Sequence, residues 1–279
     1  MRKHLISLIG LLAILSCGQK SNSSSDSDEQ AGTKQAQELE VTPLEYSYDK
    51  NKIEVGLDID YPTGSALIDK AVAEYISEKL GGTYDGDLAN GDSLVNYYGD
   101  EILAELKKHL KEDINNGVED EYINGYYRKM EIKKEYETDL LVTYSYTEDI
   151  YLNGAHGMQY FYGQTFRKSD GRRFDEGMMR QLYSEEMYEL RKEGLREYFN
   201  ESGDNANTDE ELKECIITDD DVNYLPMPKH TPYVTKKGMV FIYQPYEISY
   251  YAAGAPTFTI PLKKMKPFLT QTAKELLEM

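Results

Sequence analysis

Residues 126–166 read YYRKMEIKKEYETDLLVTYSYTEDIYLNGAHGMQYFYGQTF, and this stretch decides the fold. Aromatic and aliphatic side chains recur at every second position, as at Val142, Tyr144 and Tyr146. A period of two is typical of a β-strand with one buried face. The Asn153-Gly154 dipeptide favours a tight turn between two such runs. The stretch therefore predicts a three-stranded antiparallel meander.

The segment before the meander predicts one strand and two helices. Residues 53–60 alternate apolar and polar side chains, as a half-buried strand requires. Apolar residues then recur at helical spacing over 67–80 and again over 94–110. Asp92 or Ser93 is the predicted N-cap of the second helix, because both side chains can accept a hydrogen bond from its free amides.

Shorter elements are predicted after the meander. The patterns indicate helices over 187–199 and 210–216, a hairpin over 234–243, a strand over 257–260 and a closing amphipathic helix over 262–277. The whole chain is thus expected to have an α+β fold, with helices packed on one face of a mainly antiparallel sheet. We expect two similar-sized halves, an N-terminal α+β domain over 41–152 and a C-terminal α+β domain over 153–279.

The first 17 residues are typical of a bacterial lipoprotein signal. Arg2 and Lys3 supply positive charge, Leu5–Leu15 is apolar, and the small Ser16 precedes Cys17. The apolar run is shorter than the roughly 20 residues that span a bilayer, but it suits a signal peptide. We predict a signal peptide over 1–16, lipidation of Cys17 and a cell-envelope protein anchored by lipid to the outer membrane, at its periplasmic face or the cell surface. A plain secretory peptide is the alternative.

Residues 17–40 predict a flexible acidic tether, because they offer almost nothing to bury. The run Ser24–Glu29 (SSDSDE) resembles the acidic export tag of Bacteroidota lipoproteins. We expect ordered structure to start near Val41.

The charge balance limits the possible partners. The chain carries a formal net charge of −19 at pH 7, which argues against nucleic-acid binding and favours basic partners or solubility alone. Lipidation of Cys17 would leave Cys215 as the single free cysteine, so we expect no disulfide.

Two stretches resemble a known bacterial domain family. The first is Tyr151–Gly157 (YLNGAHG), followed by Phe174, and the second comprises Tyr233–Ile248 (YVTKKGMVFIYQPYEI) and Ala252–Pro261 (AAGAPTFTIP). The family is a domain of unknown function that forms the extracytoplasmic part of lysozyme-sensing anti-sigma factors. By the order of their elements, residues 41–152 resemble the companion domain that precedes it, a type found beside a peptidoglycan deacetylase.

The resemblance implies a binding protein to which no catalytic residues are attributed. Lysozyme is basic and would suit an acidic protein. An anti-sigma factor also needs a transmembrane helix and a sigma-binding cytoplasmic segment, and the sequence predicts neither. We therefore expect capture of lysozyme, or of another envelope-associated protein or glycan, without cytoplasmic signalling.

The candidate binding or structural residues come from the two resembling stretches. They are Asn153, Gly154, His156, Tyr246, Tyr250, Tyr251 and Gly254. Tyrosine anchors interfaces through a large ring with a polar end. Strand propensity is the competing explanation for many of the 25 tyrosines in the chain.

An accessory or enzyme of peptidoglycan or glycan hydrolysis or deacetylation is the alternative function, with His156 as its candidate residue. No histidine or cysteine shows zinc-type spacing and no G-x-S-x-G motif is present, so we expect no metal and no cofactor. The acids Asp219, Asp220 and Asp221 are interpreted as solvated surface. An enzyme would place His156 in a cleft within hydrogen-bonding reach of a carboxylate, whereas a binding module would bond it to the backbone of a closed turn.

Overall fold

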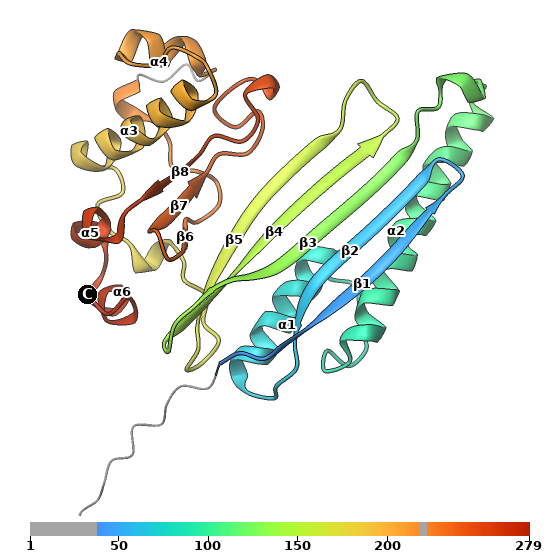
Figure 1. Cartoon of the computed structure of the whole chain (residues 1–279), viewed down its shortest axis with the longest axis horizontal. Coiled ribbons are helices and arrows are strands. Elements are labelled where there is room, and N and C mark those ends of the chain that lie inside the picture. Colours follow the sequence, from blue (N-terminus) through green and yellow to red (C-terminus); the bar gives the residue numbers. More distant parts are fainter. Residues whose placement is uncertain (1–37, 218–221) are drawn as a thin grey trace, which may run out of the picture. The chain divides into compact units, whose positions relative to one another are not determined.

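The computed structural model describes residues 38–217 and 222–279, which belong to one compact unit (Figure 1). The predicted signal peptide, Cys17 and nearly all of the tether lie outside the described residues, as do Asp219, Asp220 and Asp221. The fold is a mixed α+β fold, which confirms the predicted class. No helix in the described part of the chain combines the length and apolar character that a membrane crossing requires.

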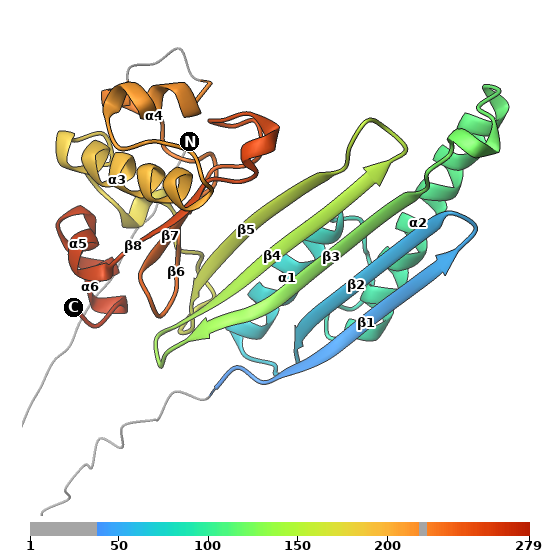
Figure 2. The ribbon, with the colours of Figure 1, turned by 45° about the horizontal axis from the view of Figure 1, so that its top comes forward.

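One five-stranded sheet contains the predicted meander. Its strands lie in sequence order, and each neighbouring pair is antiparallel except β2 and β3, which are parallel. The strands are β1 (Val41–Lys50), β2 (Ile53–Pro62), β3 (Tyr126–Glu137), β4 (Leu141–Leu152) and β5 (Met158–Arg167). The meander from β3 to β5 is confirmed. β1, which the pattern did not predict as a strand, pairs with β2 at one edge of the sheet (Figure 2).

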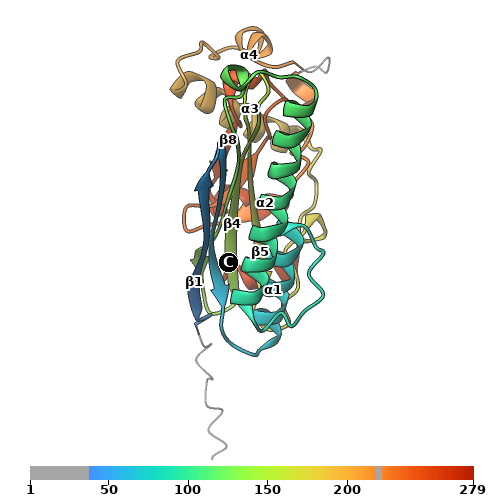
Figure 3. The same cartoon turned by 90° about the vertical axis from the view of Figure 1, so that its right-hand side faces the viewer.

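Two helices cover one face of this sheet. α1 (Leu67–Leu80) and α2 (Gly91–Asn115) follow β2 and lie on the same side of the strands (Figure 3). Together they form the long crossover that a parallel strand pair requires. The β2 side chains Val55, Leu57 and Ile59 are buried and alternate with half-buried residues, so the helices cover the apolar face of the strand.

The N-terminus of α2 corrects the predicted cap. The helix begins at Gly91, and the side-chain oxygen of Asn90 accepts a hydrogen bond from the Ser93 amide at 3.0 Å. Asp92 and Ser93 lie inside the first turn. Because asparagine caps a helix as well as aspartate or serine, the cap moves to the first suitable side chain before Gly91.

The second half consists of shorter elements. A three-stranded antiparallel sheet has the order β6-β7-β8, which confirms the predicted hairpin and last strand. The remaining elements of the chain are η1 (Asp120–Tyr122), η2 (Glu176–Met178), α3 (Glu185–Glu201), α4 (Asp209–Cys215), η3 (Val222–Tyr224), β6 (Tyr233–Val234), β7 (Met239–Ile242), η4 (Tyr251–Ala253), β8 (Thr257–Ile260), α5 (Leu262–Met265), η5 (Lys266–Phe268) and α6 (Gln271–Leu276).

The predicted closing helix over 262–277 is wrong as a single helix. Pro267 lies in η5, and the next residue but one, Leu269, is extended and forms a β-bridge with Met179. Thr270 then caps α6 by accepting a hydrogen bond from the Ala273 amide at 3.3 Å. The proline, which lacks an amide hydrogen, and the bridge together divide the segment into three short pieces.

Two hydrophobic cores meet at β5. The first lies between the large sheet and its two helices, and the second surrounds α3 and the small sheet. On the sheet face away from α1, the Val234 amide donates to Thr165 Oγ1 at 2.9 Å, and the Tyr233 ring lies directly against Gly163. The large sheet thus includes β5, which lies after residue 152. The division into domains over 41–152 and 153–279, expected from the sequence, stays a prediction.

Candidate functional site

The loop between β4 and β5 carries three of the predicted site residues. Asn153 has a φ of 57°, a left-handed conformation that asparagine adopts more readily than most residues. Its side chain accepts a hydrogen bond from the Asn124 amide at 2.8 Å and donates one to Asp113 at 3.1 Å. The Gly154 carbonyl accepts from the Tyr151 hydroxyl at 3.0 Å. Asn153 and Gly154 therefore fix the shape of the loop that carries His156.

His156, Tyr246 and Tyr251 form what we call the aromatic cluster. The ring centroids of His156 and Tyr251 are 4.0 Å apart, and those of Tyr246 and Tyr251 are 5.5 Å apart. The rings are inclined by 24° and 28° in these two pairs, so each pair is stacked. Residues about 90 positions apart in the chain are thus brought together from the β4–β5 loop and the segment before β8.

One backbone carbonyl holds two of the three rings. His156 Nδ1 donates to the Gly157 oxygen at 2.7 Å, and the Tyr251 hydroxyl donates to the same oxygen at 2.7 Å. The remaining nitrogen of the imidazole, Nε2, faces the Tyr246 hydroxyl at 3.4 Å. With Nδ1 carrying the proton, Nε2 is the acceptor for that hydroxyl.

Tyr246 occupies a strained position in a tight turn. Its φ is 67°, and the Glu247 amide donates to the Gln244 carbonyl at 2.9 Å. Pro245 at the second position and a positive φ at the third are the marks of a type II turn, whose third position favours glycine. A large side chain there costs about 1–2 kcal/mol.

The carboxylate of Glu247 stabilises this turn. It accepts hydrogen bonds from the amides of Lys229 at 2.6 Å and Gln244 at 2.8 Å. The Gln244 side chain is bonded to Phe161 of β5, which attaches the turn to the large sheet. Surrounding contacts therefore hold Tyr246 in place although the residue remains 49% exposed.

A cavity of about 530 Å³ adjoins the aromatic cluster. Its lining residues are Gln159, Phe161, Tyr198, Pro245, Tyr251, Ala252, Gly254, Ala255 and Thr257. Gly254 has a φ of 70° and ends η4, where an added Cβ would lie 3.3 Å from the Tyr198 hydroxyl. Tyr250 is 63% exposed and, within the described residues, makes no ring contact with the cluster.

The hydrogen-bonding partners of His156 define the chemistry that the aromatic cluster offers. Within the described residues, the hydrogen-bonding groups around His156 are a backbone carbonyl and a tyrosine hydroxyl, without a carboxylate. In the same part of the chain, no three histidine, cysteine or acidic side chains are grouped to hold a metal ion. The surface offers apolar ring faces bordered by hydroxyl groups, which suits the binding of another molecule.

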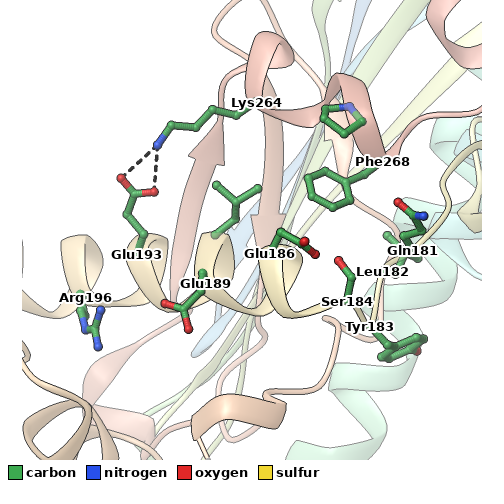
Figure 4. A pocket seen from close by; sticks show the side chains of 12 residues that line it. Gln181, Leu182, Tyr183, Ser184, Glu186, Glu189, Glu193, Arg196, Lys264 and Phe268 are labelled. Carbon is green, nitrogen blue, oxygen red and sulfur yellow. Dashed lines mark hydrogen bonds and ion pairs between the residues drawn. The ribbon is translucent and has the colours of Figure 1, made fainter.

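A second concave surface was not predicted from the sequence. It is a groove of about 1160 Å³ along α3, opposite η5 (Figure 4). Its lining residues are Gln181, Leu182, Tyr183, Ser184, Glu186, Glu189, Leu190, Glu193, Arg196, Lys264, Pro267 and Phe268. In the sequence, the three- and four-residue spacing of Glu186, Leu190 and Glu193 indicates one helix face, which is the face that lines this groove. The opposite wall comes from more than 70 residues later, so no local pattern defines it.

Part of the chain matches a described domain family. Residues 178–263 match the family described as "Protein of unknown function (DUF3298)". This range includes all of α3 as well as Tyr246 and Tyr251, but not His156. The match confirms the expected resemblance to a domain family of unknown function.

Two solved structures have a similar fold. A DUF3298 family member from Bacteroides fragilis is 21% identical with a TM-score of 0.70, over 88% of this chain and 100% of that one. A DUF3298 family protein from Pseudomonas aeruginosa is 14% identical with a TM-score of 0.55, over 85% of this chain and 97% of that one. At these identities the likeness concerns the fold. None of the curated proteins matches the chain.

Proposed function

We propose that the protein is a non-catalytic binding protein of the cell envelope that captures its ligand on the aromatic cluster. The observation that carries this proposal is the strained and exposed Tyr246, whose ring is half exposed at a φ of 67°. Backbone strain persists where surrounding contacts enforce it, and it concentrates at binding and catalytic sites. A rigid tyrosine that projects from a fixed turn is also a favourable anchor for a protein interface.

The ligand we propose is lysozyme or another basic protein that reaches the envelope. The net charge of −19 would attract a basic partner and speed the encounter, while the aromatic rings would supply the contact. The resemblance of the Tyr233–Pro261 region to the ectodomain of lysozyme-sensing anti-sigma factors supports the same ligand. We place the protein at the outer membrane, held by a lipid on Cys17.

The alternative, an enzyme or accessory of peptidoglycan or glycan hydrolysis or deacetylation, has less support. Its candidate residue, His156, donates to the backbone oxygen of Gly157 and stacks on Tyr251. A general acid or base needs a partner that adjusts its proton affinity and an open path to substrate. His156 is exposed, but within the described residues its hydrogen-bond partners are a backbone carbonyl and a tyrosine hydroxyl, without a carboxylate to adjust its proton affinity.

The binding proposal is tested with residues 18–279, which contain the whole described structure, and lysozyme as the probe at low ionic strength. We expect a dissociation constant in the micromolar range or below by titration calorimetry. Replacing Tyr246 with alanine should weaken binding at least tenfold, because a central aromatic anchor is worth about 2 kcal/mol or more. Tyr224→Ala is the matched control, since that ring is also exposed, at 64%.

Different outcomes test lysozyme as the ligand and the aromatic cluster as the binding surface. No detectable binding at micromolar lysozyme would exclude lysozyme as the ligand. Binding that is equally strong in Tyr246→Ala and Tyr224→Ala would exclude the aromatic cluster as the surface. The anchor is tested separately, because Cys17→Ser should abolish lipid labelling and membrane partitioning of the full chain.

Tyr246→Gly gives a prediction that distinguishes binding from packing. Glycine adopts a positive φ without strain, so the free energy of unfolding should stay unchanged or rise by up to about 1 kcal/mol. Ligand binding should nevertheless fall as far as in Tyr246→Ala. A clear drop in the urea midpoint of Tyr246→Gly would show that the ring supports the fold rather than the ligand.

A further inference from the structure

The groove along α3, here the α3 groove, has an apolar floor. Leu182 and Phe268 are 8% and 5% exposed, and Leu190 is half-buried. Tyr183 lies at one end with 66% of its surface exposed. Figure 4 shows Leu182 and Tyr183 at the end where α3 begins, and Phe268 on the segment opposite the helix. An apolar floor with an exposed tyrosine at its end is suited to apolar side chains.

Main-chain hydrogen bonds hold the two walls of the groove together. The Arg180 amide donates to the Phe268 carbonyl at 2.9 Å, and the Thr270 amide donates to the Met178 carbonyl at 3.0 Å. The Arg180 guanidinium also donates to the Pro267 carbonyl at 3.0 Å. The groove is therefore formed before any ligand arrives, which lowers the entropic cost of binding.

The buried Arg191 fixes the start of α3 from beneath. Its guanidinium is fully buried and donates to the carbonyls of Leu182 and Leu225, both at 2.8 Å. Leu182 belongs to the floor of the groove. The segment that leads into α3 is thereby held at a set position, and the floor cannot close by local collapse.

The rim of the groove is acidic. Glu186, Glu189 and Glu193 lie on the groove side of α3 at spacings of three and four residues, and all three are exposed. The cations near the rim are already engaged, because Lys264 pairs with Glu193 at 2.8 Å, Lys192 pairs with Glu189 at 2.5 Å and Arg196 pairs with Asp209. Among the described residues, Glu186 is the rim carboxylate that forms no ion pair with a lysine or arginine. A cationic ligand would thus find the Glu186 carboxylate without displacing a repelling charge.

An ion pair within the chain already forms at this rim. Lys264, in the basic segment Lys263-Lys264 of α5, reaches across the groove and contacts both oxygens of Glu193 at 3.0 and 2.8 Å. A lysine on a second helical segment thus pairs with a rim carboxylate beside an apolar floor. Glu186, about two turns earlier on the same face, offers the same group to an incoming chain.

We infer that the α3 groove binds a basic amphipathic helix of a partner protein. A helix alongside α3 would place apolar side chains on Leu182, Leu190 and Phe268, and a lysine or arginine side chain near Glu186. This is the helix-in-groove mode, in which anchors recur every three or four residues. The site is distinct from the aromatic cluster, so the inference does not depend on the function proposed above.

The test uses a defined probe and residues 18–279. The probe is a labelled peptide of leucine and lysine, about 14 residues or four helical turns long, with its leucines on one face. Fluorescence anisotropy at low salt should give a dissociation constant in the micromolar range. A peptide of the same composition with its leucines scattered over all faces should bind at least tenfold more weakly.

Charge reversal at the rim locates the site. Glu186→Lys should weaken binding about tenfold at low salt, and the loss should shrink as salt rises. Glu101→Lys is the matched control, because it makes the same charge change at an exposed position of α2, and it should leave binding unchanged. Leu190→Asp, which places a charge on the floor, should remove binding, provided that circular dichroism shows a folded chain.

Two results would overturn the inference. If Glu186→Lys and Glu101→Lys lower the affinity alike, the peptide responds to net charge and the groove is not its site. Equal binding of the two peptides would exclude an apolar floor contact. Tyr246→Ala should bind the peptide normally, and this separates the α3 groove from the aromatic cluster.

Discussion

The two cores of this protein are built in different ways. The first core joins strands of 10 and 12 residues to a helix of 25 residues, and its hydrophobic cluster consists of aliphatic and aromatic side chains, several of them tyrosines. The second core uses strands of two and four residues and encloses a fully buried arginine, Arg191. Long regular elements satisfy their own backbone groups, whereas short ones depend on side chains to do so.

The difference also explains where the binding surfaces lie. Tyr246 stands in a turn of the second core, and the α3 groove lies between a helix and an irregular segment of the same core. Regular elements bury their apolar faces against one another, while turns and short helices leave rings and grooves open. The first core thus supplies a scaffold, with the loop of His156 as its contribution to the aromatic cluster.

The largest expected effect contrasts Arg191 with Leu94, a fully buried residue of the first core. Arg191→Met keeps most of the volume but leaves the Leu182 and Leu225 carbonyls without donors, so the free energy of unfolding should fall by about 2–4 kcal/mol. Leu94→Met conserves volume in an apolar site and should cost less than about 1.5 kcal/mol. Urea unfolding measures both. Equal and small losses would show that the guanidinium is not needed in the second core.

The contact between the two cores gives an intermediate effect. An added Cβ on Gly163 would lie 2.2 Å from the Tyr233 ring, so Gly163→Ala must displace this ring of β6 and should cost about 1–3 kcal/mol. Gly154→Ala is the matched control, because nothing lies within 4 Å of its added Cβ. Thermal unfolding of both variants decides the matter. A midpoint for Gly163→Ala that equals that of Gly154→Ala would mean that the two cores are not tightly packed there.

The smallest effect concerns Glu137, at the end of β3. Burial alone would raise the pKa of its carboxyl, but the hydrogen bonds from Lys168, the Leu39 amide and Lys134 outweigh burial and lower it. A lowered pKa in the folded state means that the carboxylate stabilises the fold above its ordinary pKa, and that this contribution disappears as pH falls through the folded value.

Glu137→Gln should therefore lower the free energy of unfolding by about 1–2 kcal/mol at neutral pH. The difference from the unmodified chain should close as the pH falls below about 4. Urea midpoints measured from pH 7 downwards test the sign. A difference that grows in acid would contradict the assigned direction.

Most of the first core was predictable from the sequence, because its long elements repeat their pattern several times. The meander, α1 and α2 follow from the regular spacing of apolar side chains along the sequence. β1 was missed because it is an edge strand, with Pro43 and half-buried side chains that blur the alternation. The parallel pairing of β2 with β3 could not be predicted, since the partner lies beyond two helices.

The second core and its surfaces were predicted only in part. His156, Tyr246 and Tyr251 were each named as candidates, but their stacking depends on turns that no local pattern specifies. The α3 groove escaped prediction because its floor joins Leu182 and Leu190 to Phe268 across the chain. A single proline and one β-bridge were enough to break the expected closing helix. Short elements give few repeats, so long-range contacts decide their ends.

The attachment of Leu39 has a mechanical consequence. Its side chain is buried, its amide donates to Glu137 Oε1 at 2.8 Å, and its carbonyl accepts from Lys134 Nζ at 2.9 Å. A pulling force applied at Glu38 would have to break these bonds before it could separate β1 from β2. The edge strand is therefore protected against peeling from its N-terminal end, and the strength of that protection should decline in acid as Glu137 becomes protonated.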